Sequence, residues 1–255
     1  EGYYRQRIEA LCRRADLAYA DILYWPIFGG RMITAGVMGL VGRFRYILVT
    51  RALLQILTPT EIDAVIAHEI GHVKKHHLLF YLFFFIGYMV VTYATFDLIV
   101  YLIIFSEPIY RFVFSTGISR TTVTTGLLSL AIIVNFLVYF RYIFGYFMRN
   151  FERQADAFVY RLFASAAPLI STFEKIAAVS GHAPDKPNWH HFSIRQRVDF
   201  LRRCEQDRRR IEVHDRKVRN SIAVFAASLV VVGMAGYQLN FGQTGKRLNE
   251  KFFET

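Results

Sequence analysis

The sequence is poor in cysteine, and its two cysteines lie far apart. The 255-residue chain contains Cys12 and Cys204, with no Cys-x-x-Cys pair and no cluster of cysteine with histidine. This absence excludes cysteine-based zinc sites, and we expect no stable disulfide between the two thiols. Any bound metal is therefore expected to be held by histidine and carboxylate side chains.

Charged residues are nearly absent from three long apolar stretches, at residues 78–105, 126–147 and 221–239. Asp97 and Arg141 are the charges that they contain. Each stretch reaches the roughly 20 residues that a helix needs to cross a hydrocarbon core of about 30 Å. Buried helices of a soluble protein are the alternative. Three such stretches in one chain of this size favour membrane spans, of which the first two would form a hairpin.

Acidic residues are outnumbered, because 20 Asp and Glu stand against 31 Lys and Arg, for a net charge of +11. Of the basic residues, 25 fall in residues 1–77 and 148–220, which a two-span hairpin places on one side of a membrane. The positive-inside rule assigns that side to the cytoplasm. The basic stretch from Arg202 to Arg219 would then face anionic headgroups, and we expect a lipid bilayer and no nucleic acid as partner.

The first part of the chain predicts a helix over residues 3–14 and a small sheet after it. Arg31–Ala35 and Tyr46–Thr50 are the strand candidates, separated by a glycine-containing turn region. Thr58-Pro-Thr-Glu61 has the pattern of a capping box with proline at the first helical position. This pattern predicts a helix that starts there and continues toward the first span near Leu78.

The later part of the chain predicts further helices around the second and third apolar stretches. Residues 151–163 and a segment beginning at Pro168 read as helical, and the segment between Gly181 and Asn188 reads as a loop. Ser193 to Asp215 is expected to form one charged helix that leads into the last span. The segment 106–122 is expected to be a loop.

The sequence His68-Glu-Ile-Gly-His72 predicts a metal site on the capped helix. Two histidines four residues apart project from one face of a helix, so both imidazoles can bind one zinc ion. Glu69 is angled away from the pair but can reach a water at the metal, where a carboxylate can act as general base. The alternative is a pair of surface histidines on a helix. The apolar residues before the motif favour the metal site.

A catalytic zinc usually has a third protein ligand, and Glu152 is the best candidate for it. Asp156 lies four residues further on, on the same helical face, and could fix the tautomer of a ligand histidine. A solvated acidic pair is the alternative. Because the histidines precede the first span and Glu152 follows the second, a hairpin would bring all three ligands to one side of the membrane.

The combination of His68-Glu-x-x-His72 with Glu152-x-x-x-Asp156 resembles the integral-membrane gluzincins, which include the HtpX-type heat-shock proteases and the CAAX prenyl proteases. Similar stretches cover about residues 28–205 and include Ile47–Leu54, Leu57–Ala67, Phe151–Phe158 and His191–Arg197. The resemblance implies a zinc endopeptidase with one zinc ion per chain.

The resemblance also implies roles for residues outside the two motifs. His191 would stabilise the oxyanion of the tetrahedral intermediate, and Arg197 keeps the six-residue spacing that the family shows after this histidine. Phe192 stands where the family usually has proline, so adjacent His190 is an alternative for this role. The family binds substrate as an added strand along a sheet edge, which here would be formed by Met32, Ile33, Thr34, Ala35 and Gly36.

These observations predict a mainly α membrane protein. A zincin-like α+β catalytic core with a small β-sheet would be joined to about three transmembrane helices. The expected parts are 1–77 (small sheet and histidine-pair helix), 78–147 (transmembrane hairpin), 148–220 (third ligand and oxyanion histidine) and 221–255 (last span and tail). The expected substrate is a polypeptide, in particular a membrane protein. The expected location is a bacterial inner membrane, with the active site on the cytoplasmic side.

Two other functions are compatible with parts of the sequence. A catalytically silent membrane scaffold could use zinc structurally, but it would need neither Glu69 nor an open coordination position. A site-2-type intramembrane protease would bury its histidine motif within a span. Here the motif precedes the span in a segment with polar flanks, which disfavours that class.

Overall fold

The computed structural model describes residues 2–30, 32–180, 191–242, 245–246 and 250. By its internal contacts the chain divides into two units. The first, here called the sheet unit, comprises Glu1–Tyr81 and Gly145–Val218. The second, here called the helical unit, comprises Leu82–Phe144 and Arg219–Thr255. Each unit is described by itself.

The sheet unit opens with a helix and a small mixed sheet. Its first elements are α1 (Gly2–Arg14), β1 (Asp21–Tyr24), β2 (Ala35–Met38) and β3 (Tyr46–Val49). Within the described residues the strand order is β1–β3–β2, with β1 parallel and β2 antiparallel to the central strand β3. The fully buried Ile47 anchors β3 in the core, whereas β2 forms one edge of the sheet.

The strand expected at Arg31–Ala35 is wrong in position, because β2 begins only at Ala35. Thr34 is still tied to Thr50, whose backbone N–H donates to the Thr34 carbonyl at 3.1 Å. The Thr34 N–H, however, donates to the Thr50 hydroxyl at 3.2 Å instead of a backbone carbonyl. The regular ladder therefore starts one residue later. β1 was not recognised in the sequence, because its four residues show no clear alternation.

The capped helix predicted at Thr58 is α3 (Pro59–Lys74), which follows the short α2 (Arg51–Ile56). Glu61 Oε2 accepts the N–H of Thr58 at 2.7 Å, so the capping box is confirmed. The predicted continuation toward the first span is wrong. His76 has a left-handed backbone with φ of 57°, which ends the helix, and a new helix starts at His77.

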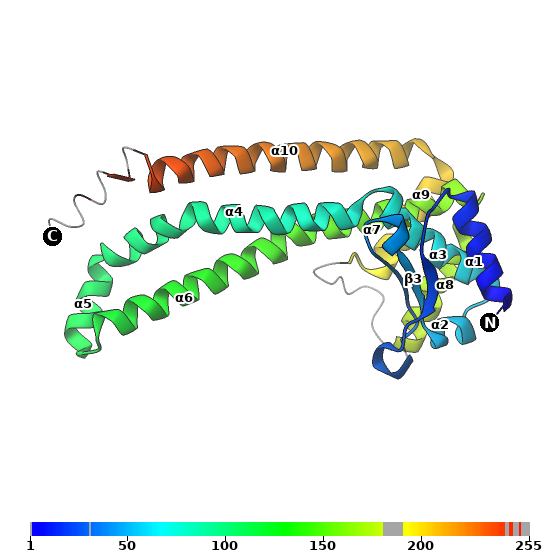
Figure 1. Cartoon of the computed structure of the whole chain (residues 1–255), viewed down its shortest axis with the longest axis horizontal. Coiled ribbons are helices and arrows are strands. Elements are labelled where there is room, and N and C mark those ends of the chain that lie inside the picture. Colours follow the sequence, from blue (N-terminus) through cyan, green and yellow to red (C-terminus); the bar gives the residue numbers. More distant parts are fainter. Residues whose placement is uncertain (1, 31, 181–190, 243–244, 247–249, 251–255) are drawn as a thin grey trace. The chain divides into compact units, whose positions relative to one another are not determined.

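Most of the helical unit is a hairpin of α4 (His77–Ile104) and α6 (Arg120–Val138), joined by α5 (Glu107–Thr116) (Figure 1). A π-helical turn (Tyr139–Phe144) follows α6, and the next helix, α7 (Gly145–Leu162), belongs to the sheet unit. The segment 106–122 is thus not simply a loop. Pro108 in the first turn starts α5, and Gly117, with φ of 67°, ends it.

The last helices of the chain are α8 (Ala167–Ser180), α9 (Ile194–Gln206) and α10 (Arg209–Asn240). The prediction of a single charged helix over Ser193–Asp215 is wrong. The helix ends before Asp207, which has an extended backbone, and a new helix follows. Asp207 Oδ1 accepts the N–H of Arg209 at 3.1 Å, which satisfies one of the free donors at the start of α10. The capping interaction therefore favours the break.

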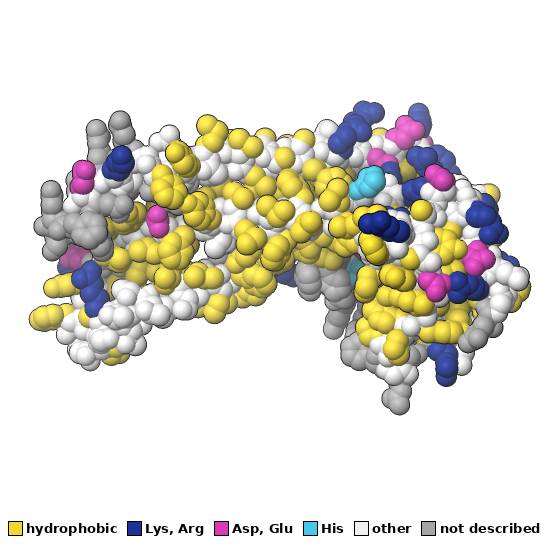
Figure 2. Space-filling view, in the orientation of Figure 1, with side chains coloured by type: hydrophobic (Ala, Val, Ile, Leu, Met, Phe, Trp, Pro, Cys, Tyr) yellow, Lys and Arg dark blue, Asp and Glu magenta, His cyan; other side chains and the backbone are white. Residues whose placement is uncertain are grey.

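Three helices among the described residues are long and apolar enough to cross a membrane: His77–Ile104, Arg120–Leu162 and Arg209–Leu239. At most 17% of the residues in their most apolar windows are buried. Figure 2 shows hydrophobic side chains gathered along much of the visible faces of these helices. The predicted fold class, a mainly α membrane protein with a small sheet and about three spans, is confirmed.

The helical unit is held by close helix contacts and one buried hydrogen bond. Tyr139, on the π-helical turn, donates from its hydroxyl to the backbone carbonyl of Phe84 at 2.6 Å. A methyl group on Gly87 would come within 2.8 Å of the Phe225 ring, and one on Gly236 within 2.6 Å of the Ala94 Cα. Glycine at these positions therefore allows α4 and α10 to approach closely.

Glu61 is expected to stabilise the sheet unit in a pH-dependent way. Burial raises its pKa, but hydrogen bonds from Lys175, Ser171 and Thr58 outweigh burial and lower it to about 2. Because the folded pKa lies below the unfolded one, this stabilisation is present above about pH 4.5 and is lost as the pH falls toward 2. Glu61→Gln should cost about 1.5–3 kcal/mol at pH 7. Unfolding in detergent at pH 7 and pH 3 measures the effect.

The difference between Glu61→Gln and wild type should shrink at pH 3. Glu174→Gln is the matched control, because Glu174 is exposed and lies 3.7 Å from Arg202 in a surface pair. It should change stability by less than about 0.5 kcal/mol. An equal loss for Glu61→Gln at both pH values would contradict the assignment.

Candidate metal centre

Helix α3 presents His68 and His72 on one face. Their Nε2 atoms lie 3.2 Å apart, and their rings meet edge to face with centroids 4.9 Å apart. The capping box at Thr58 and the buried side chains of Ile62 and Ile66 fix the start and the inner face of this helix. The spacing of four residues therefore places both imidazoles together, as the sequence predicts.

Helix α7 carries Glu152 to the same place. Its Oε1 lies 3.4 Å from His72 Nε2, and its Oε2 lies 3.7 Å from His68 Nε2. The three ligand atoms fall within 4.8 Å of one another. Two imidazoles and one carboxylate are a donor set suited to zinc.

Gly71 permits this convergence, because α3 and α7 touch there. A methyl group on Gly71 would lie 3.0 Å from the Ala155 Cα and 2.8 Å from the Phe158 Cβ. Separations of that size are too short for carbon atoms, so any larger residue would push the two helices apart. The distance between Glu152 and the histidines therefore depends on a glycine at this position.

Asp156 and Arg197 surround His68 and Glu152. Asp156 Oδ1 lies 2.9 Å from His68 Nδ1, and Arg197 donates to both Asp156 oxygens, at 2.6 and 2.9 Å. Arg197 also lies 3.4 Å from Glu152 Oε2. One buried guanidinium thus contacts two buried carboxylates and compensates part of their charge. Asp156 in turn orients His68 so that its Nε2 points toward Glu152.

His77 lies beside His72 in the way that Asp156 lies beside His68. Its Nδ1 lies 3.0 Å from His72 Nδ1, and its ring stacks on Phe151. His77 is fully buried, whereas its sequence neighbour His76 is exposed. A five-residue spacing does not place two side chains together on a helix. Only the break at His76 makes the contact possible.

The surroundings favour a neutral His72 and a proton-accepting Glu69. Burial lowers the pKa of His72 to about 4 and raises the pKa of Glu69 to about 7. Burial lowers the pKa of the His68 imidazole, but the hydrogen bond and the charge of Asp156 raise it by more, so the pKa of His68 is raised. A neutral His72 can offer a lone pair to a metal, and Glu69 can exchange a proton near neutral pH.

His191 reaches the centre from the segment before α9. Its Nδ1 lies 3.1 Å from Glu152 Oε2. Next to it, Phe192 lies under the guanidinium of Arg153, 3.7 Å from ring centroid to Cζ. This cation–π contact anchors the loop at the position where the family usually has proline. His190, the alternative residue, lies outside the described residues.

A cavity of about 460 Å³ opens onto the cluster. Among its lining residues are His68, Glu69, His72, Glu152, His191 and Arg197. The edge strand β2 and the residues before it line the same cavity through Ile33, Thr34, Ala35, Gly36 and Val37. Met32, the remaining residue of the predicted substrate strand, is exposed and is not part of this lining.

A family model described as peptidase family M48 matches residues 1–233. The chain belongs to peptidase family M48. This is the metallopeptidase family of the HtpX-type and CAAX proteases, so the resemblance stated from the sequence is confirmed. A search of curated proteins and a search of solved structures each returned no significant match.

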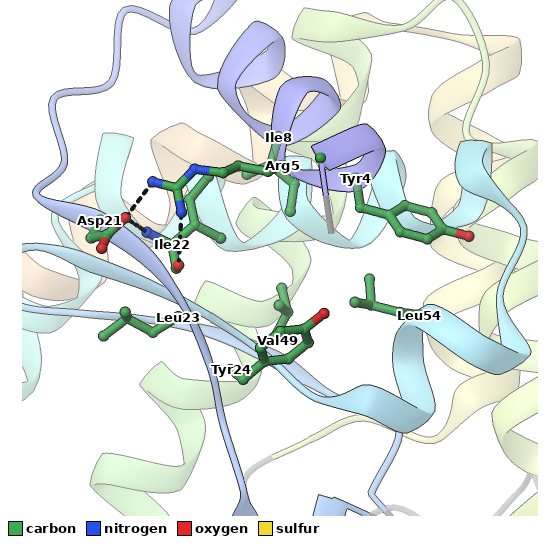
Figure 3. Close-up of a pocket in the computed structure, with 10 residues that line it drawn as sticks. Tyr4, Arg5, Ile8, Asp21, Ile22, Leu23, Tyr24, Val49 and Leu54 are labelled. Atoms are coloured by element: carbon green, nitrogen blue, oxygen red, sulfur yellow. Dashed lines mark hydrogen bonds and ion pairs between the residues drawn. The ribbon is translucent and has the colours of Figure 1, made fainter.

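A second cavity of this M48 peptidase, of about 420 Å³, lies between α1 and β1 (Figure 3). Its charged residues Arg5 and Asp21 pair with each other at 2.5 Å, and Arg5 also donates to the Ile22 carbonyl at 3.5 Å. The rest of the lining is largely apolar, with Leu23 and Val49 visible in the same view. Because its charges neutralise each other, this cavity offers no reactive group comparable with the histidine cluster.

Gly71→Ala tests the close contact on which the metal centre of this M48 peptidase depends. The added methyl group should separate α3 from α7, lower the stability by about 1–3 kcal/mol and weaken metal binding. Gly126→Ala is the matched control, because a methyl group there meets nothing within 4 Å. Metal content after dialysis and unfolding in detergent measure both effects. Unchanged metal binding in Gly71→Ala would contradict the prediction.

Proposed function

We propose that this M48 peptidase is a zinc-dependent endopeptidase that cleaves membrane or membrane-associated polypeptides at the cytoplasmic face of a bilayer. The observation that carries the proposal is the convergence of His68, His72 and Glu152, with Glu69 lining the same cavity. In this proposal the catalytic core is assembled from residues 1–77 and 148–220. The hairpin and the last helix hold it at the membrane.

The side chains fit one zinc ion per chain. His68 and His72 would bind it through Nε2, because their Nδ1 atoms face Asp156 and His77 respectively. Glu152 would supply the third ligand. These three protein ligands would leave a coordination position open, as in other catalytic zinc sites.

Glu69 is the proposed general base and acid. When bound, zinc supplies Lewis-acid polarisation of the scissile carbonyl and of the attacking water. The Glu69 carboxylate takes a proton from that water and returns it to the leaving amine nitrogen. Its pKa of about 7 in the metal-free protein suits a group that must both accept and donate near neutral pH.

His191 is the proposed stabiliser of the developing oxyanion. Its Nδ1 lies 3.1 Å from Glu152 Oε2, which leaves Nε2 as the ring nitrogen that can face the oxyanion. The stacking contact between Phe192 and Arg153 holds the residues directly before α9 in place. A donor of this kind contributes about 2.7–4 kcal/mol to transition-state stabilisation.

The substrate is proposed to bind as an added strand along the edge of β2. Backbone pairing there would align a peptide largely independently of its side chains. Leu53, Leu57, Leu169 and Phe173 line the cavity beside the cluster and favour an apolar side chain near the scissile bond. The long apolar helices with their exposed side chains support a bilayer as the setting.

Glu69→Gln tests the mechanism without removing a proposed metal ligand. Cleavage of a quenched-fluorescence peptide with apolar residues around its scissile bond should fall about 10²–10⁴-fold, because a carboxamide cannot take the proton. Zinc content should stay at one ion per chain. Glu152→Gln is the contrasting variant and should lose both zinc and cleavage.

Different results would contradict the mechanism and favour the scaffold alternative. Cleavage by Glu69→Gln at the wild-type rate would show that the mechanism is wrong. Zinc binding by a wild-type protein that cleaves no peptide would favour the silent scaffold instead. Comparing the cleaved termini of membrane proteins in cells with wild type and with Glu69→Gln would identify the substrates.

A further inference from the structure

His77 connects the proposed ligand His72 to a chain of polar groups that the mechanism above does not use. The His77 side chain is fully buried, and Phe151 stacks on its ring with centroids 4.3 Å apart and planes at 8°. His77 Nδ1 lies 3.0 Å from His72 Nδ1, and His77 Nε2 lies 3.2 Å from Gln154 Oε1. Gln154 Nε2 in turn donates to Asp215 Oδ1 at 2.7 Å.

The Asp215 end of this series of hydrogen bonds fixes which group donates and which accepts at each step. A carboxylate only accepts hydrogen bonds, and Lys75 donates to Asp215 Oδ2 at 2.5 Å. The Gln154 amide must therefore turn its nitrogen toward Asp215 and its oxygen toward His77. His77 then donates from Nε2. Because its buried ring, covered by Phe151, is favoured in the neutral form, its Nδ1 is left as an acceptor.

The same logic sets the tautomer of His72. Its Nδ1 must carry the proton that His77 Nδ1 accepts, so the lone pair lies on Nε2, the atom that faces Glu152. We propose that His77, Gln154 and Asp215 are positioning residues that hold His72 ready to bind the metal. This inference rests on the metal site proposed above.

Both proposed ligand histidines are thus oriented with Nε2 free for the metal, but by different sets of contacts. His68 meets the carboxylate of Asp156 directly, and Arg197 holds that carboxylate. His72 reaches the carboxylate of Asp215 through two intermediate side chains, and Lys75 holds that carboxylate. Residues near both ends of the hairpin, together with the start of α10, therefore orient one metal ligand.

The break between α3 and α4 makes the contact possible. His76 adopts the left-handed conformation, its backbone N–H bonds to the Val73 carbonyl at 3.0 Å, and His77 begins the next helix. On a continuous helix His77 would lie on a different face from His72. The two adjacent histidines therefore have different environments, and His76 provides a matched control for changes at His77.

The test measures the affinity of the purified, detergent-solubilised chain for Zn²⁺ by competition with a chelating indicator. His77→Phe keeps a ring on Phe151 but removes the acceptor for His72, so the affinity should fall about 10–100-fold. His77→Asn places a carbonyl oxygen near the position of Nδ1 and should restore most of the loss. His76→Asn should bind Zn²⁺ like wild type.

Asp215→Asn tests the donor-to-acceptor direction of the hydrogen bonds that run from His72 to Asp215. An asparagine amide can donate as well as accept, so Gln154 is no longer held in one orientation, and Zn²⁺ affinity should fall. Wild-type protein without affinity for Zn²⁺ would overturn the metal site itself. Wild-type affinity in both His77→Phe and Asp215→Asn would leave the metal site standing and overturn the positioning role.

A spectroscopic measurement on the unsubstituted chain does not depend on how any variant folds. In metal-free protein labelled with ¹⁵N-histidine, the ring ¹⁵N shifts show which nitrogen carries the proton. We expect the proton on Nδ1 of His72 and on Nε2 of His77. A His77 protonated on Nδ1, facing an unprotonated Nδ1 of His72, would overturn the proposal.

Discussion

The close contact between α3 and α7 at Gly71 is the constraint on which the proposed metal centre depends. Two histidines on one helix provide only part of a catalytic metal site, and the remaining ligand comes from a helix about eighty residues later in the sequence. Gly71 lies against Ala155 and Phe158, so the two helix axes can approach until Glu152 reaches both imidazoles. The rest of the sheet unit maintains this approach.

Charge balance is the second requirement, because the centre buries two carboxylates close together. Arg197 contacts both Glu152 and Asp156 and compensates part of their charge. Removing one partner from such a buried group is strongly destabilising, since it leaves a charge without compensation. A bound dication would supply the remaining positive charge. If the proposed metal binds, the same carboxylates link folding of the sheet unit to metal binding.

Features that depend on local sequence were predictable, and those that depend on tertiary contacts were not. The Thr58 capping box, the helical face shared by His68 and His72, and the long apolar stretches follow from spacing and composition. The start of β2 did not follow, because the Thr50 side chain replaces a ladder partner. Nor did the role of His77, which depends on a left-handed His76 and on contacts with Gln154, far along the chain.

The central claim is that α3 and α7 together hold one metal ion through two imidazoles and one carboxylate. X-ray absorption at the zinc K-edge of the purified, zinc-loaded protein tests it most directly. The account predicts a first shell of nitrogen and oxygen at about 2.0–2.2 Å with the outer-shell scattering of two imidazoles. A sulfur shell at about 2.3 Å, or the scattering of a single imidazole, would contradict it.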